Sequence, residues 1–159
     1  MTRTREQALS RYPELGQLIA GEMERGGDRS VVEVVDPTTG KALGLVTLAT
    51  ESDVDRALTA AKRGFEVWRK TSAFERAKVL RKVAEGMRAQ TDRLAELLVL
   101  ELGKPWQEAV GEVEQAAGMW EWAAEEGRRA YGRIIPSRES DTRHAVAQLC
   151  QLIDGDDSP

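Results

Sequence analysis

The sequence predicts a mixed α/β protein in which a β-hairpin is followed by four mainly antiparallel helices and a C-terminal strand. A run of β-branched residues, Val31–Val35, indicates a strand. Apolar residues then recur at steps of three and four through residues 50–131, which is the period of a helix. After Gly132 the pattern becomes extended again. With 159 residues, the chain is long enough for one domain with its own core.

The predicted hairpin follows a polar N-terminal arm. Residues 1–29 form this arm, with one short strand or helix at 15–20 and a turn at 26–28. In the hairpin, residues 43–49 form the second strand, after the turn Asp36-Pro37-Thr38-Thr39-Gly40. Proline fixes φ early in a turn, and glycine supplies the positive φ near its end.

Capping residues and helix breakers divide the middle of the chain into four helices, and the short links between them favour antiparallel neighbours. The start signals are Thr50 with Asp53 or Ser52 with Asp55, then Ser72 with Glu75, and then Thr91 or Asp92. Gly103 ends the third helix, and Pro105 serves as the first residue of the fourth. The fourth helix runs from Trp106 to about Tyr131, and Gly132 ends it.

Each helix carries apolar residues on one face, which we expect to be packed. The predicted face of the first helix comprises Val54, Ala57, Leu58, Ala61, Phe65 and Trp68. That of the second comprises Phe74, Ala77, Leu80, Ala84 and Met87, and that of the fourth comprises Val110, Val113, Ala117, Trp120 and Ala124. The third helix contributes Leu94, Leu97, Leu98 and Leu100.

Composition narrows the class of protein. Hydrophobic residues make up 41% and charged residues 31%, with no apolar run of membrane-spanning length and no secretory leader, so we expect no membrane association. The net charge is -4 and the basic residues alternate with acids, which argues against nucleic-acid binding. A single cysteine excludes an internal disulfide, and a cytoplasmic location is expected.

The residues alone indicate no active site. Cys150 is the one available thiol, and His144 precedes it by six positions on a predicted extended segment, which places the two side chains apart. We expect this pair to be inert. The sequence contains no phosphate-binding glycine loop and no zinc-ligand spacing.

A series of collinear segments resembles the N-terminal part of the NAD(P)-dependent aldehyde dehydrogenase family. These segments are VVDPTTGK at 34–41, DVDRA at 53–57, AA at 60–61 through Phe65 to WR at 68–69, ERA at 75–77, LRK at 80–82, ELGKP at 101–105 and YGRIIP at 131–136. Order and spacing agree over roughly residues 18–148. The ending EWAAEEGRRAYGRIIPS most resembles the succinate-semialdehyde dehydrogenase branch.

The resemblance implies a division of the chain. Residues 30–136 correspond to the β-hairpin and the helical part of the cofactor-binding domain, and residues 137–149 to a strand that leads toward the family's oligomerisation sheet. Residues 150–159 form an acidic tail without a family counterpart. In the family, NAD or NADP accepts the hydride from an aldehyde; we expect this chain alone not to bind either cofactor.

The match stops near Gln148, and the family's catalytic groups would follow it. The oxyanion-hole Asn, the cofactor-binding Lys, the Glu base and the nucleophilic Cys are absent, and Cys150 does not match the nucleophile's position. Aldehyde oxidation needs a thiolate, a hydride acceptor, oxyanion donors and a base. We therefore expect a truncated aldehyde dehydrogenase with no catalytic residue and no activity of its own.

Two sets of residues can be carried over from the family. The Val34 carbonyl and Glu101 match positions that hold a monovalent cation in many members, although a solvated helix-terminal Glu is the alternative. Gln115, Met119 and Trp120 lie on the helix that lines the family's substrate tunnel.

The missing part of the family fold affects stability and partners. Without the sheet under the helices, we expect a helical, loosely packed and aggregation-prone species unless a partner covers it. The candidate partners are a second copy of the chain and a full-length aldehyde dehydrogenase. The competing interpretation is a non-enzymatic helical interaction module that pairs with a full-length paralogue.

Overall fold

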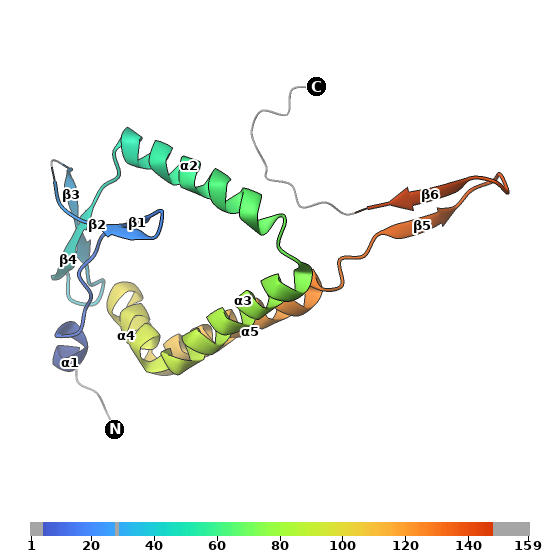
Figure 1. Ribbon diagram of the computed structural model, residues 1–159. Coiled ribbons are helices and arrows are strands. Elements are labelled where there is room, and N and C mark those ends of the chain that lie inside the picture. Colours follow the sequence, from blue (N-terminus) through green and yellow to red (C-terminus); the bar gives the residue numbers. More distant parts are fainter. Residues whose placement is uncertain (1–4, 28, 148–159) are drawn as a thin grey trace.

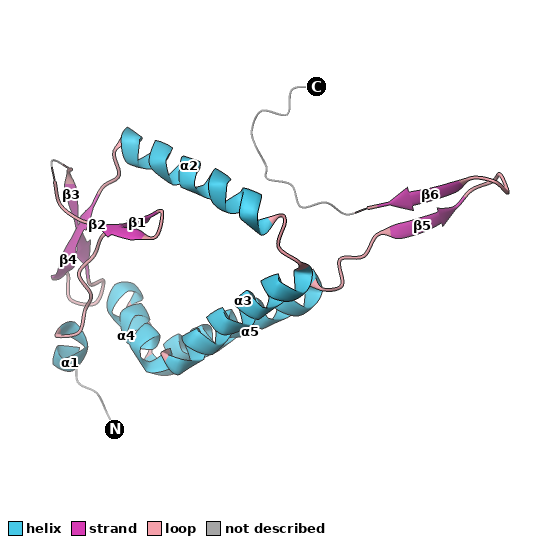
Figure 2. Cartoon of the chain, viewed as in Figure 1, coloured by secondary structure: helices cyan, strands magenta, loops and turns pink. Residues whose placement is uncertain are grey.

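The computed structural model describes residues 5–27 and 29–147 and confirms the mixed α/β class (Figure 1). The strands in the described part form three separate antiparallel pairs, and the four long helices lie between the second and the third pair in the chain (Figure 2). The elements are α1 Arg5–Leu9, β1 Gln17–Ile19, β2 Glu22–Glu24, β3 Val31–Val35, β4 Ala42–Thr47, α2 Glu51–Trp68, α3 Ala73–Ala89, α4 Thr91–Leu102, α5 Trp106–Gly127, β5 Arg133–Pro136 and β6 Arg143–Val146.

The N-terminal arm holds more structure than the sequence predicts. The single short element expected at 15–20 is one half of a hairpin, in which β1 pairs with β2. Ala20 and Gly21 join the two strands, and both have positive φ (55° and 90°), as a two-residue hairpin turn requires. The arm therefore folds through a turn whose alanine gave no sequence signal.

The main hairpin forms as predicted. β3 and β4 pair in antiparallel register, with a bulge between Val34 and Val35. Gly40 takes φ 67° and donates its N–H to the Asp36 carbonyl at 2.8 Å. The Asp36 carboxylate accepts the backbone N–H of Thr38 at 2.8 Å, so the turn is closed by both backbone and side chain.

Some of the predicted helix boundaries are correct and others are wrong. Thr50 and Asp53 form the complete capping box of α2, and Ser72 caps α3. Neither Thr91 nor Asp92 caps α4, because Gln90 is the N-cap residue and makes no side-chain cap bond. The fourth helix ends at Gly127 rather than near residue 131, since the following N–H groups bond only three residues back.

Pro105 is likewise the N-cap residue of α5 rather than its first helical residue. Gly132, predicted to end that helix, serves a different purpose. A Cβ there would lie 2.3 Å from the Val146 carbonyl oxygen, so the close approach of the chain to β6 requires glycine.

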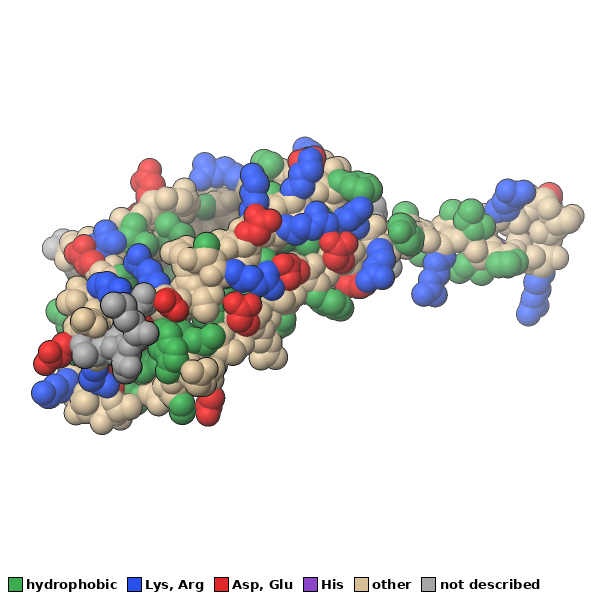
Figure 3. All heavy atoms as spheres, turned by 90° about the horizontal axis from the view of Figure 1, so that it is seen from below, with side chains coloured by type: hydrophobic (Ala, Val, Ile, Leu, Met, Phe, Trp, Pro, Cys, Tyr) green, Lys and Arg blue, Asp and Glu red, His purple; other side chains and the backbone are tan. Residues whose placement is uncertain are grey.

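The helices pack around one antiparallel pair. α3 and α5 lie side by side, and α4 contacts α5 (Figure 1). Small buried side chains line these contacts, which lets the helix axes approach closely: Ala77 and Ala84 on α3, and Ala109, Ala117 and Ala124 on α5. On the surface beside these alanine contacts, Arg88 of α3 pairs with Glu121 and Glu114 of α5, and Arg81 of α3 pairs with Glu125 of α5. Charges of both signs are therefore interspersed on this surface (Figure 3).

α2 does not join this bundle as an antiparallel neighbour. It leaves the hairpin region and runs apart from α3 and α5 until the turn after Trp68 (Figure 1). Its predicted apolar face is correspondingly exposed, with Leu58 64% and Val54 49% accessible. The sequence pattern is helical as predicted, but its apolar face has no covering layer among the described residues.

β5 and β6 form a hairpin that projects from the helices (Figure 1). Residues 134 and 135 are extended as predicted, and Pro136 is the last residue of β5. β6 lies within the segment 137–149 that the family resemblance assigns to a strand, and the last two residues of that segment fall outside the described part. Ile134 is 76% exposed, so the hairpin is held by backbone pairing more than by burial. No described helix combines the length and apolar character needed to cross a bilayer.

Candidate functional site

One tyrosine contacts both Glu101 and the hairpin that contains Val34, the two candidate cation residues. The Tyr12 hydroxyl donates a hydrogen bond to Glu101 Oε1 at 2.7 Å. Its ring lies against Gly44, where a Cβ would be 3.4 Å from the ring carbon Cε1. Gly44 is the register partner of Val34 across the hairpin. Tyr12 therefore connects the hairpin that contains Val34 with the helix end that carries Glu101.

The hairpin turn packs against the end of α4 and fixes Glu101 there. Gly103 caps this helix at φ 69°, and a Cβ on it would lie 3.0 Å from Thr38 Cγ2 and 3.3 Å from Pro37 Cγ. Both the left-handed conformation and the close contact favour glycine. The Gly-Lys-Pro sequence after Glu101 thus ends the helix where the hairpin turn passes.

The place where the N-terminal arm, the hairpin and the end of α4 meet around Tyr12 is called the Tyr12 junction. Arginines from the arm pair with two further carboxylates there. Arg5 forms an ion pair with Asp36, which is 1% exposed. Arg11 Nη2 lies 2.6 Å from Glu96 Oε1, and Glu96 is 6% exposed. Because buried carboxylates need such partners, these pairs hold the arm to both the hairpin and α4.

The surroundings of the Tyr12 hydroxyl favour its protonated form. Burial, and then the hydrogen bond to the Glu101 carboxylate, raises the pKa of the Tyr12 hydroxyl above its ordinary value. The hydroxyl therefore remains protonated and donates to Glu101 throughout the physiological range. Nothing in the sequence singled out this tyrosine, since an isolated Tyr in a polar arm carries no motif.

The donor atoms at this junction are of a kind that suits a hard monovalent cation. The Glu101 carboxylate and the Tyr12 hydroxyl offer oxygen atoms, and Val34 lies on the hairpin strand opposite Gly44. Within residues 5–27 and 29–147, no group of three or more His, Cys, Asp and Glu side chains has the geometry to hold a metal ion. A cation here would therefore depend on backbone and hydroxyl oxygens in addition to Glu101.

The candidate tunnel residues on α5 are all exposed, but they do not share one side of the helix. Met119 is 66% and Trp120 42% exposed, and Gln115 is exposed as well. Gln115 and Met119 lie away from the side that carries the buried Val113, whereas Trp120 lies on that side. Trp120, predicted to belong to the packed face, is thus only partly covered, because alanines rather than large side chains make the contact with α3.

Only one member of the candidate thiol pair lies in the described part of the chain. His144 is exposed on β6, in register with Ile135. Cys150 lies outside the described residues. The described part of the chain therefore contains no cysteine that could act as a nucleophile.

Comparisons with known proteins identify the family. Residues 24–149 match the sequence model of the aldehyde dehydrogenase family. The chain is 41% identical over 138 residues to 4-(hydroxymethyl)benzenesulfonate dehydrogenase TsaD1 of Comamonas testosteroni, covering 87% of this chain and 29% of that protein. It is 40% identical over 129 residues to the succinate-semialdehyde dehydrogenase [NADP(+)] GabD of Escherichia coli K12, covering 81% and 27%.

Solved structures agree with this fold. An NADP-dependent enzyme of E. coli aligns with a TM-score of 0.78 and 39% identity, covering 84% of this chain and 28% of that one. A betaine aldehyde dehydrogenase of Staphylococcus aureus, solved in complex with NAD+, aligns with a TM-score of 0.79 and 25% identity, covering 87% and 28%. The chain thus spans less than a third of the length of these relatives. Because the family model matches most of this chain, the chain belongs to the aldehyde dehydrogenase family, whose members are NAD(P)-dependent oxidoreductases.

Proposed function

We propose that these residues form the N-terminal part of an NAD(P)-dependent enzyme that oxidises an aldehyde to its acid, with succinate semialdehyde as the substrate. The observation that supports this is the match of residues 24–149 to the family, with a succinate-semialdehyde dehydrogenase among the relatives. By itself the 159-residue chain does not catalyse the reaction and does not bind NAD or NADP.

The chemistry explains why the chain alone is inactive. A thiolate must add to the aldehyde carbon, the resulting thiohemiacetal must pass a hydride to NAD(P)+, and water must then release the acid. Each step needs a group aimed at the reacting carbon, such as a thiolate, oxyanion donors or a base. The single cysteine does not stand at the family nucleophile's position. The carboxylates at the Tyr12 junction are already engaged, since Asp36 and Glu96 pair with arginines and Glu101 accepts a hydrogen bond from Tyr12.

An assay of the purified chain tests this proposal. The chain is mixed with succinate semialdehyde and NAD+ or NADP+, and absorbance of the reduced cofactor is followed, with GabD of E. coli as the positive control. We expect no turnover above the reaction without protein. Sustained reduction of the cofactor that increases with protein concentration would contradict the proposed inactivity.

A second candidate function is a non-enzymatic module that pairs with a full-length member of the family. The exposed apolar face of α2 favours it, since such a surface is stabilised when another layer covers it. Light scattering of the chain alone and mixed with a full-length relative distinguishes the two. A defined mixed complex supports pairing, whereas a chain that self-associates and does not bind the full-length relative contradicts it.

The role proposed for Glu101 is to hold a monovalent cation together with the Val34 carbonyl. Its test is the melting temperature in potassium chloride compared with choline chloride at equal ionic strength. We expect the wild-type chain to melt higher in potassium and Glu101→Gln to lose that difference. Equal melting of the wild type in both salts would refute the cation site.

Other family features are proposed for the longer protein. Gln115, Met119 and Trp120 face the substrate tunnel, and residues 137–149 lead into the oligomerisation sheet that joins copies. The exposure of the three side chains and of the projecting β5–β6 hairpin supports both roles, because each leaves a surface for a further layer.

A further inference from the structure

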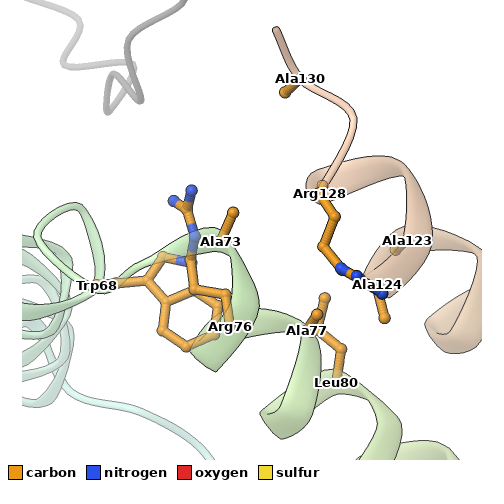
Figure 4. A pocket seen from close by; sticks show the side chains of 10 residues that line it. Trp68, Ala73, Arg76, Ala77, Leu80, Ala123, Ala124, Arg128 and Ala130 are labelled. Carbon is orange, nitrogen blue, oxygen red and sulfur yellow. The ribbon is translucent and has the colours of Figure 1, made fainter.

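A cavity of about 580 Å³ opens where the end of α2 meets the α3–α5 pair (Figure 4). Its walls come from three helices, with Trp68 at the end of α2, Leu80 on α3 and Arg128 just after α5. Alanines from α3 and α5 form much of the remaining lining. Small-molecule sites typically measure roughly 300–1,000 Å³, so the space is large enough for a small ligand.

The cavity is positively charged although the chain is acidic overall. Its lining includes Arg76 and Arg128 and contains no Asp or Glu, whereas the net charge of the chain is -4. The Arg76 guanidinium pairs with no residue in the described part of the chain. α3 also begins at this cavity, at Ala73, and a helix N-terminus adds partial positive charge.

The Arg128 side chain is held in place, and one of its N–H groups lacks a hydrogen-bond acceptor in the described part of the chain. Its guanidinium carbon lies 4.8 Å from the centre of the Phe74 ring, which fixes the group by a cation–π contact. Its nearest carboxylate, Glu125, is 3.4 Å away and is shared with Arg81. Nε is buried and has no hydrogen-bond acceptor among the described residues. This guanidinium therefore has unused hydrogen-bonding capacity.

The cavity combines these cations with an apolar wall. Arg76 and Trp68 line one side of the cavity, and from the other side the Arg128 side chain reaches toward Ala77 and Ala124 (Figure 4). A guanidinium presents a planar fork of donors that suits a carboxylate. The Trp68 ring and Leu80 offer apolar surface for a short hydrocarbon chain.

We propose that this cavity binds a small carboxylate with a short apolar tail. The carboxylate pairs with Arg76 and Arg128, and the tail lies against Trp68. This site lies apart from the Tyr12 junction in sequence and does not depend on the proposed enzymatic function.

Nuclear magnetic resonance of the 15N-labelled full 159-residue chain tests the site. Hexanoate is titrated at constant ionic strength, and the indole N–H signal of Trp68 and the Nε–H signal of Arg76 are followed. We expect saturable shifts with a dissociation constant on the order of 1 mM, since a short ligand with one charged group gains limited affinity. Hexanol, which has the same tail without the charge, should produce no saturable shift.

Matched variants assign the binding to the arginines. Arg76→Gln should weaken hexanoate binding roughly tenfold or more, because a charge-assisted pair is lost. Arg63→Gln removes an exposed arginine of α2 away from the cavity lining and should leave binding unchanged. Absence of a saturable hexanoate shift in the wild-type chain, an equal response to hexanol, or equal weakening by both variants would overturn the proposal. The two wild-type titrations decide it even where a variant does not fold.

Discussion

Truncation of Leu100 measures how much of the fold depends on the packed helices. Leu100 on α4 is 1% exposed and is one of the largest fully buried side chains of the described chain. Leu100→Ala removes buried methyl groups and leaves a cavity, which costs about 2–5 kcal/mol. For a chain of this size, that loss lowers the melting temperature by roughly 5–15 °C. Thermal unfolding followed by circular dichroism provides the measurement.

Leu58→Ala is the matched control, because it makes the same chemical change on α2. Leu58 is 64% exposed, so only about a third of its surface is withdrawn from water and its loss should cost about 0.5–1 kcal/mol. The difference between the variants therefore reports whether the face of α2 is covered. If Leu58→Ala destabilises the chain as much as Leu100→Ala does, α2 is packed in solution and the reasoning fails.

Three further predictions concern single contacts. Arg29, with Thr50, holds the pKa of Asp53 well below its usual range. The stabilisation is therefore present above the unfolded pKa of about 4 and is lost as the pH falls from there through the lower folded pKa. The melting temperature of the wild type should drop on acidification below a pH of about 4, and that of Asp53→Asn should drop less. Gly132→Ala places a Cβ 2.3 Å from the Val146 oxygen and should abolish the cross-strand nuclear Overhauser contacts of β5 and β6, whereas Gly111→Ala, which has open space in α5, should raise the melting temperature by stabilising the helix. Gly103→Ala introduces a side chain at φ 69° and 3.0 Å from Thr38, so urea unfolding should show a loss of roughly 1–2 kcal/mol; an unchanged midpoint would mean that the hairpin turn does not contact α4 in solution.

Local structure could be predicted where residues close in sequence fix the backbone between them. The turn from Asp36 to Gly40 and the capping box of Thr50 with Asp53 depend on residues three or four positions apart, and both form as predicted. The start of α4 could not be predicted in the same way. Thr91 and Asp92 are good capping residues, but Gln90 takes the position because the chain turns sharply after α3.

Tertiary arrangement could be predicted only in part. Helical periodicity correctly selects Ala77, Ala84 and Ala117 as packed, but it cannot say that α2 stands apart, since an apolar face has the same pattern whether it is covered or exposed. The same limit applies to Phe74, which is 62% exposed and instead supports Arg128. Side-chain periodicity carries no information about which layer lies against a helix.

The Tyr12 junction was also beyond the reach of sequence reasoning. Glu101 and Val34 could be selected from the family pattern, but Tyr12 lies 89 positions from Glu101 in the chain. Its importance follows from the path of the N-terminal arm across the hairpin, which no local pattern specifies. Arg5 and Arg11 became recognisable as parts of the junction only through the buried carboxylates that they meet.

Amide hydrogen exchange of the isolated chain tests most directly whether these residues form an incomplete layer of a larger enzyme. The packed pair α3 and α5 should exchange slowly, because opening it exposes the buried alanines between the two helices to solvent. α2 should exchange much faster, since its apolar face is uncovered. Equal protection of α2 and α5 in the monomeric chain would contradict the account, because the first part of the enzyme would then be a complete fold by itself.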